Sequence, residues 1–125
     1  MLAELTVKEF LDKVAGSDPV PGGGSVAALN GAVASALTAM VAGLTIGKKG
    51  YEEHEELMKH ISRLSIRQQE VFVEYIDRDS EAYDHVFGCF QLPTSTDEEM
   101  AARCAAIHGA LRFAARVRKR VARTA

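Results

Sequence analysis

A run of 21 residues without a charged side chain, Val26 to Ile46, constrains the fold more than any other part of this sequence. Its length would suffice to cross a bilayer. However, much of it is alanine, Asn30 and Thr38 interrupt it, and no aromatic belt flanks it. We therefore predict a helix packed inside protein. Small residues at every fourth position predict a smooth stripe for close helix packing: Ala27, Gly31, Ser35, Ala39 and Gly43.

The remainder of the chain predicts three further helices. Capping boxes at Thr6–Glu9 and Thr96–Glu99 mark two helix starts, and the first of these helices should end near Ala15. A long helix is predicted over residues 51–90, where apolar residues follow helical spacing, and Leu92-Pro93 breaks it. No segment alternates as a strand would. The sequence predicts an all-α helical bundle with one long helix and a central small-residue helix.

Length and composition favour one domain over residues 1–125. Three other helices are too few to surround the uncharged helix, so we expect a homodimer or a higher homo-oligomer. The net charge of −2 gives no general bias toward nucleic acid or membranes, although residues 112–125 hold six basic side chains and no acid. Two cysteines and a charged N-terminal segment favour a cytoplasmic protein.

The stretch Pro21-Gly22-Gly23-Gly24-Ser25 ends a loop predicted over residues 17–24. Three consecutive glycines can adopt positive φ, and backbone N–H groups before a helix favour an anion or a flat ligand. No strand precedes this loop and no lysine ends it, so neither nucleotide-binding fingerprint fits. The simpler alternative is a flexible turn that lets two helices pack tightly.

Asp79 interrupts the apolar seam of the long helix. A carboxylate in that place is costly to bury without a partner, and such acids are candidates for acid–base chemistry. The alternative is that Asp79 is solvated or pairs with an arginine. Tyr83 lies one turn further along the same face. A simple hairpin register between the last two helices would place His108 near Asp79.

Two pairs of side chains that could bind a metal stand at i,i+4 spacing, His85 with Cys89 and Cys104 with His108. In the hairpin register that we expect, Cys89 and Cys104 are offset by about 9 Å along the helices. We therefore predict that the chain has no metal site.

Three motifs, in order, resemble the cyclodeaminase/cyclohydrolase family of folate enzymes. They are residues 21–28, residues 40–51, and residues 77–83 followed by Leu92-Pro93, and the resemblance extends over nearly the whole chain. The family includes the C-terminal domain of formiminotransferase-cyclodeaminase and the bacterial methenyltetrahydrofolate cyclohydrolases. The resemblance implies an all-helical, dimeric domain that binds tetrahydrofolate near the glycine loop and needs no metal or other cofactor.

The function implied by this resemblance is hydrolysis of 5,10-methenyltetrahydrofolate to 10-formyltetrahydrofolate. One alternative is ammonia elimination from 5-formiminotetrahydrofolate, and another is a non-catalytic helical protein that binds a folate or forms oligomers. A nucleic-acid-associated oligomer that uses the basic tail is a further alternative. Family domains continue beyond this length, so the chain is expected to be a C-terminally short member.

The resemblance also suggests roles for individual residues. Asp79 matches the family's acidic motif and is the candidate for stabilising the cationic methenyl carbon and accepting a proton from water. Lys48 is the second catalytic candidate. Lys48 or Lys49 could pair with a folate carboxylate or assist proton transfer to a ring nitrogen. Candidate substrate contacts are Pro21, Gly22, Gly23, Gly24, Ser25, Lys49, Tyr51 and Tyr83. About 30 Å of helix separates the glycine loop from the two lysines, so we expect a second subunit to complete the site.

Overall fold

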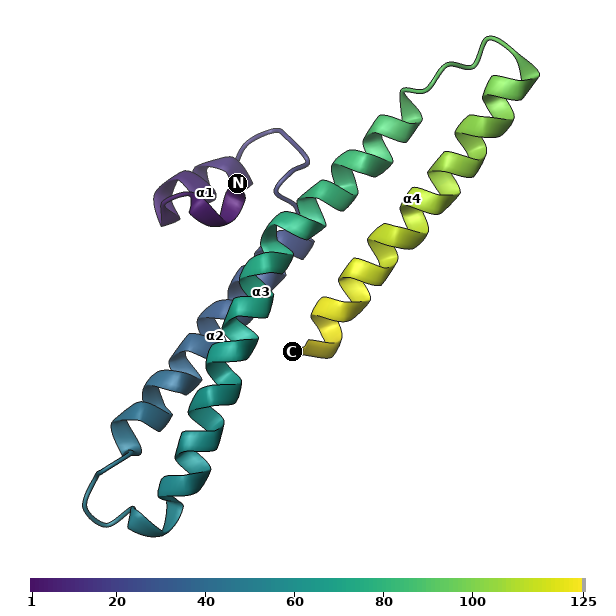
Figure 1. Cartoon of the computed structure of the whole chain (residues 1–125). Coiled ribbons are helices and arrows are strands. Elements are labelled where there is room, and N and C mark those ends of the chain that lie inside the picture. Colours follow the sequence, from purple (N-terminus) through teal and green to yellow (C-terminus); the bar gives the residue numbers. More distant parts are fainter. Residues whose placement is uncertain (125) are drawn as a thin grey trace.

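The computed structural model describes residues 1–124 and is all-α over that range (Figure 1). The helices, with η for a 3-10 helix, are η1 (Leu2–Glu4), α1 (Val7–Val14), α2 (Gly23–Thr45), η2 (Glu52–His54), α3 (Glu55–Phe90) and α4 (Asp97–Thr124). The predicted helical class is confirmed, and so are the long helix and the small-residue helix. The break between α3 and α4 falls where Leu92-Pro93 predicts it.

The long helix α3 organises the molecule and extends for about 54 Å. Figure 1 shows α2 antiparallel to one half of α3, α4 antiparallel to the other half, and α1 beside its middle. The core therefore lies around the middle of α3, where all these elements approach. Its buried apolar side chains are Phe10, Ala28, Ala32, Phe72, Tyr75, Ile76, Ala82, Val117 and Val121.

Both predicted capping boxes are present. Glu9 N donates to Thr6 Oγ1 at 3.2 Å, and Thr6 N donates to Glu9 Oε2 at 2.8 Å. Thr96 and Glu99 repeat the pattern at the start of α4. Hydrogen bonds from the Thr6 backbone, and then from its hydroxyl, hold the pKa of Glu9 below its usual value. These bonds satisfy groups that have no partner within the helix.

The packing face of α2 differs from the predicted stripe. Its buried residues against α3 include Ala28, Ala32, Ser35 and Ala42, whereas Gly43 is exposed. A strict four-residue repeat turns by about 40° per step around a helix of 3.6 residues per turn, so it cannot stay on one face over four steps. Part of the stripe is nevertheless correct, because a Cβ at Gly31 would approach the Phe72 ring to 2.8 Å.

The opposite face of α2 is apolar and exposed. This outward face consists of Val33, Leu37, Met40, Val41 and Leu44, each more than half exposed. The prediction that the other helices leave α2 partly uncovered is therefore confirmed for the described residues.

Among the described helices, α2 is the one that is long and apolar enough to cross a membrane. This is weak evidence for a membrane span, because core helices of soluble proteins pass the same test.

The three glycines at the start of α2 do not adopt the positive φ predicted for them. Gly22 is the N-cap with φ of −98°, and the helix already begins at Gly23 rather than at Val26. Among the described residues, the glycines with positive φ are Gly47 and Gly50, which follow the other end of α2. Positive φ therefore does not explain the three glycines, and packing against α3 explains one of them, Gly24.

Candidate functional site

The first turn of α2 packs directly against a buried carboxylate on α3. Asp79 is only 4 % exposed. A Cβ built on Gly24 would overlap the carboxylate of Asp79, whereas a Cβ on Gly23 would meet no atom within 4 Å. The sequence needs glycine at position 24 because any side chain there would displace the carboxylate. This contact also puts a negative charge at the positive end of the α2 dipole, where anions are favoured.

Two buried serines fix the position of that turn on α3. Ser25 Oγ donates to the backbone carbonyl of Ile76 at 2.7 Å and lies 2.9 Å from Ser80 Oγ. Ser25 is fully buried. Its hydroxyl therefore holds α2 against α3, and the substrate contact predicted for Ser25 stays a prediction. Pro21, in the preceding loop, is also buried and joined to Val20 by a cis peptide bond.

Asp79 has an ionic partner on the third long helix. Arg118 Nε on α4 donates to Asp79 Oδ1 at 3.3 Å, and the arginine side chain is 62 % exposed. The alternative that Asp79 pairs with an arginine is thus correct, and the predicted place of Asp79 on the buried seam is correct too. Sequence reasoning treated Arg118 as one of six basic tail residues. The sequence signal that could have identified Arg118 is its position next to Val117 and near Val121, which belong to the buried core.

Arg118 stands between two hollows that flank the carboxylate. The glycine hollow has a volume of about 460 Å³ and is lined by Gly23, Gly24, Ala27, Phe72, Arg118, Val121 and Ala122. The tyrosine hollow has a volume of about 530 Å³ and is lined by Asp79, Tyr83, Val86, Leu111, Ala114, Ala115 and Arg118. Each falls within the usual range for small-molecule sites. Both walls are mostly apolar, so a flat ring could lie on either side of the carboxylate.

The predicted site residues fall into two groups. The structure brings Gly23, Gly24, Asp79 and Tyr83 together around these hollows. Lys48, Lys49 and Tyr51 lie beyond the other end of α2, about 34 Å of helix away. There, Lys48 Nζ stands 5.5 Å from the centre of the Tyr51 ring, and all three side chains are exposed. Within one copy of the chain, the two candidate catalytic residues Asp79 and Lys48 cannot act on the same atom.

The predicted approach of His108 to Asp79 is wrong. Residues 111–118 of α4 line the hollow beside Asp79, and His108 lies about 15 Å along α4 from Arg118. Arg103, six residues into α4, donates to the backbone carbonyl of Phe90, the last residue of α3. The helix α4 therefore begins beyond the end of α3, and the residues of α4 that reach Asp79 come later in the chain than a simple hairpin predicts. Among residues 1–124, no group of three or more His, Cys, Asp or Glu side chains is arranged to hold a metal ion.

Comparison with known proteins finds relatives of this chain both by sequence and by structure. A methenyltetrahydrofolate cyclohydrolase from Methylorubrum extorquens is 46% identical over 114 residues, covering 91% of this chain and 55% of that protein. A formimidoyltransferase-cyclodeaminase from Gallus gallus is 32% identical over 108 residues, covering 86% of this chain and 20% of that protein. The crystal structure of formiminotetrahydrofolate cyclodeaminase from Thermotoga maritima superposes with a TM-score of 0.83 at 35% identity, covering 99% of this chain and 58% of that one.

The sequence profile of the formiminotransferase-cyclodeaminase family matches residues 6–125. The chain therefore belongs to this family. It spans about half the length of the cyclohydrolase that it matches and a similar share of the solved cyclodeaminase.

Proposed function

We propose that the chain hydrolyses 5,10-methenyltetrahydrofolate to 10-formyltetrahydrofolate. The observation that carries this proposal is the Asp79 carboxylate, buried against Gly24 and open to a hollow on α4. The similarity to a protein named methenyltetrahydrofolate cyclohydrolase supports the choice of substrate. No cofactor or metal enters the proposed reaction, because hydrolysis of an already cationic carbon needs only a base, an acid and water.

The methenyl carbon is part of a cationic amidinium, which a fixed carboxylate attracts and stabilises. Water attacks this carbon while Asp79 accepts a proton from the water. The hydroxyl of the resulting carbinolamine then loses its proton as the carbon–N5 bond breaks, N5 takes up a proton, and the formyl group stays on N10. Overall, one water is consumed and one proton is released. The apolar walls of the two hollows would hold the pterin and aminobenzoyl rings on either side of Asp79, with Tyr83 beside the reacting carbon.

A second copy of the chain would supply the proton donor for N5. The outward face of α2 is apolar and exposed, and large exposed apolar patches mark interaction sites. If two copies of α2 pair antiparallel about a two-fold axis near the middle of the helix, the residues after Thr45 of one copy lie beside Gly23 of the other. This arrangement brings the partner's Lys48 and Lys49 to the carboxylate that is 34 Å away within one chain. We propose a homodimer, in the cytoplasm, with each site shared between the two copies.

Ammonia elimination from 5-formiminotetrahydrofolate is the second candidate reaction, because a solved cyclodeaminase is 35% identical to this chain. In that reaction N10 attacks the formimino carbon, the bond from this carbon to the departing nitrogen breaks, and ammonia leaves. The product is the same methenyl cation, so Asp79 would serve both reactions. Release of ammonia from 5-formiminotetrahydrofolate, measured beside methenyl hydrolysis on one preparation, distinguishes the two activities.

The test is the loss of methenyltetrahydrofolate absorbance above its spontaneous rate, measured for the wild type, Asp79→Asn and Asp84→Asn. Asp84 is an exposed carboxylate on the same helix and provides the matched control. We expect Asp79→Asn to reduce kcat by about 100-fold or more, as general-base removal does, and Asp84→Asn to remain near wild type. Full activity in Asp79→Asn, with an unchanged circular dichroism spectrum, would remove Asp79 from the mechanism.

A further inference from the structure

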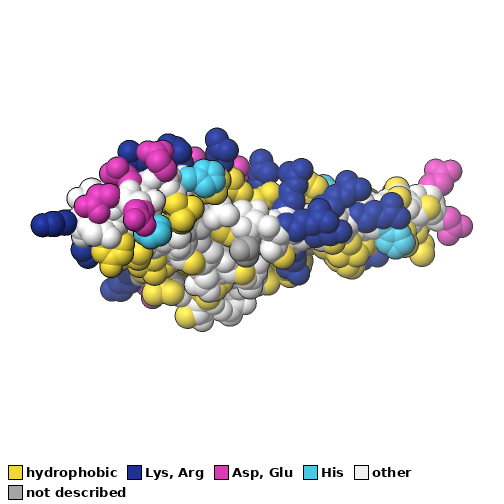
Figure 2. All heavy atoms as spheres, turned by 90° about the horizontal axis from the view of Figure 1, so that it is seen from below, with side chains coloured by type: hydrophobic (Ala, Val, Ile, Leu, Met, Phe, Trp, Pro, Cys, Tyr) yellow, Lys and Arg dark blue, Asp and Glu magenta, His cyan; other side chains and the backbone are white. Residues whose placement is uncertain are grey.

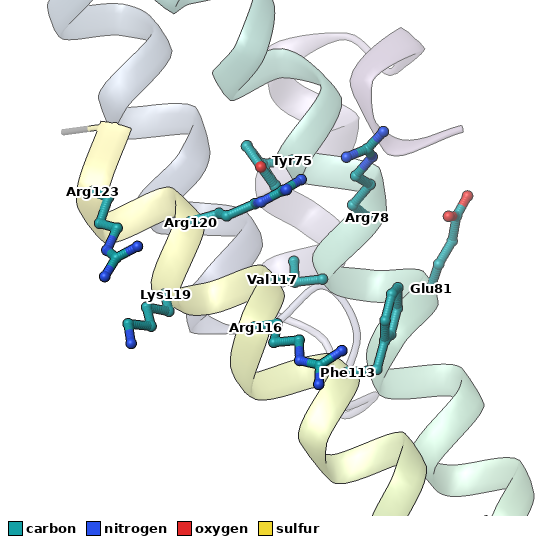
Figure 3. Close-up of a pocket in the computed structure, with 9 residues that line it drawn as sticks. All are labelled: Tyr75, Arg78, Glu81, Phe113, Arg116, Val117, Lys119, Arg120 and Arg123. Carbon is teal, nitrogen blue, oxygen red and sulfur yellow. The ribbon is translucent and has the colours of Figure 1, made fainter.

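A basic cleft lies between α3 and α4 and is separate from the two hollows beside Asp79 (Figure 3). Its volume is about 710 Å³. Five of the residues that line it are cations, namely Arg78 on α3 and Arg116, Lys119, Arg120 and Arg123 on α4, and one is an acid, Glu81. It shares no lining residue with the glycine hollow or the tyrosine hollow.

Helix stability does not account for these charges. Arg116 with Arg120, and Lys119 with Arg123, stand at i,i+4 spacing, where like charges disfavour the helix. Within residues 1–124, none of these four side chains has a carboxylate within ion-pair distance. The helix dipole accounts for one of these four basic residues at most. Its effect is confined to the last turn of α4, and Arg123 is the one basic residue in that turn. An anion in the cleft would offset this repulsion.

Side chains of both α3 and α4 line the cleft, and in Figure 3 Lys119 and Arg123 lie on the side of α4 that faces away from α3. In Figure 3, Arg120 reaches from α4 toward Tyr75, and Arg116 extends toward Phe113, while Arg78 stands across on α3. The guanidinium of Arg78 lies 5.7 Å from the centre of the Tyr75 ring, which restricts its position. Figure 2 shows Lys and Arg side chains gathered in a row along one side of the molecule, next to a surface of apolar and uncharged atoms.

Several arginines in one cleft favour a ligand with several phosphate groups. Planar guanidinium groups bind phosphate through two parallel hydrogen bonds, and they keep their charge at any physiological pH. A monoanion would leave most of the excess positive charge uncompensated, whereas a chain of phosphates matches it. The half-exposed ring of Phe113 offers an apolar surface at the edge of the cleft for a flat group attached to such a chain.

We propose that the basic cleft binds a small oligophosphate, either free or as part of a nucleoside polyphosphate. This site is distinct from the site of the proposed folate chemistry, because it shares no lining residue with the two hollows beside Asp79. Arg118, the basic residue that contacts Asp79, is not part of it.

The test is isothermal titration of inorganic tripolyphosphate into the purified protein at low ionic strength. The double variant Arg116→Gln/Arg120→Gln removes two cations from the cleft. The matched control is Arg63→Gln/Arg67→Gln, which removes two exposed arginines at the same i,i+4 spacing on α3, outside the cleft. We expect the Kd to weaken by about tenfold or more in the cleft variant and to change by less than about twofold in the control.

Equal weakening in both double variants, or no binding by the wild type, would overturn the proposal. Circular dichroism checks that both variants stay folded, and Arg116→Lys/Arg120→Lys, which keeps the charge but not the forked geometry, should bind with intermediate affinity. Tighter binding of ATP than of tripolyphosphate would identify a nucleoside polyphosphate, and equal binding a free oligophosphate. Citrate binding as tightly as tripolyphosphate, or displacement of tripolyphosphate by a lower concentration of single-stranded oligonucleotide, would contradict the assignment.

Discussion

The two ends of α2 carry glycines for different physical reasons. At the N-terminal end, Gly24 lies in ordinary helix and is needed because the Asp79 carboxylate occupies the space that a side chain would fill. At the C-terminal end, Gly47 has open space around it but a φ of +74°. One glycine permits a close approach and the other permits a backbone turn. The N-terminal end of α2, where Gly24 lies, contacts the Asp79 carboxylate of α3. The C-terminal end, which Gly47 follows, presents Lys48 and Lys49 to solvent.

This difference places the two halves of the proposed site, Asp79 and Lys48, at opposite ends of one helix. The N-terminal end of α2 packs against the buried carboxylate of Asp79 on α3 and borders the two apolar hollows. Lys48 and Lys49, which follow the C-terminal end of α2, are exposed. A folate-sized ligand cannot reach both within one copy, and the apolar outward face of α2 between them is the surface that a second copy would cover.

The largest effect is expected at the buried end, where Gly24→Ala should displace the Asp79 carboxylate. A displacement of about 1 Å in a reacting group can reduce activity by about 100-fold, so we expect a loss of that order in kcat/KM for methenyltetrahydrofolate hydrolysis. Gly43→Ala, on the same helix in open space and outside both hollows, is the control and should stay within about twofold of wild type. If both variants were equally active, the close approach would have no part in the site.

A smaller effect is expected from Arg118→Gln, which removes the ionic partner of Asp79 but leaves the carboxylate buried. A hydrogen bond to a charged group contributes about 1.5 kcal/mol, equivalent to about a tenfold loss in kcat/KM. Arg118→Lys should recover part of this loss. Arg112→Gln, on the same helix but outside the hollows, should have no effect. An Arg118→Gln enzyme with wild-type kinetics would show that Arg118 does not position Asp79.

The smallest effect is expected at the exposed end, from Gly47→Ala. An alanine in the left-handed region costs roughly 1–2 kcal/mol, and chemical denaturation should report a loss of stability in that range. Gly47→Asn should cost less, because asparagine tolerates this conformation better than other residues. If Gly47→Ala were as stable as the wild type, the distinction between the two ends of α2 would not hold.

Most of the helical architecture could be predicted from local signals. Both capping boxes, the break at Leu92-Pro93 and the uncharged run of α2 depend on residues close in sequence, and each is confirmed. Asp79 could be placed on the buried face because helical periodicity alone determines that position. The cyclodeaminase/cyclohydrolase resemblance was confirmed by comparison with known proteins.

Features that depend on the packing of separate helices could not be predicted in this way. The register of α4 on α3 depends on how far beyond the end of α3 the helix α4 begins. His108 was therefore placed beside Asp79, where Arg118 lies. The need for glycine at position 24 depends on a side chain 55 residues away. The face of α2 that packs on α3 was misplaced because a repeat of four residues does not match a helix of 3.6 residues per turn.

The measurement that tests the shared site most directly is complementation between two inactive variants. Asp79→Asn and Lys48→Met would each be inactive alone if each site takes Asp79 from one copy and Lys48 from the other. Co-expressed in equal amounts, they should form mixed dimers with one intact site, and the preparation should recover about a quarter of wild-type activity. Recovery of that size is the result that this account predicts. A co-expressed mixture of confirmed mixed dimers that stays as inactive as either variant alone would contradict it.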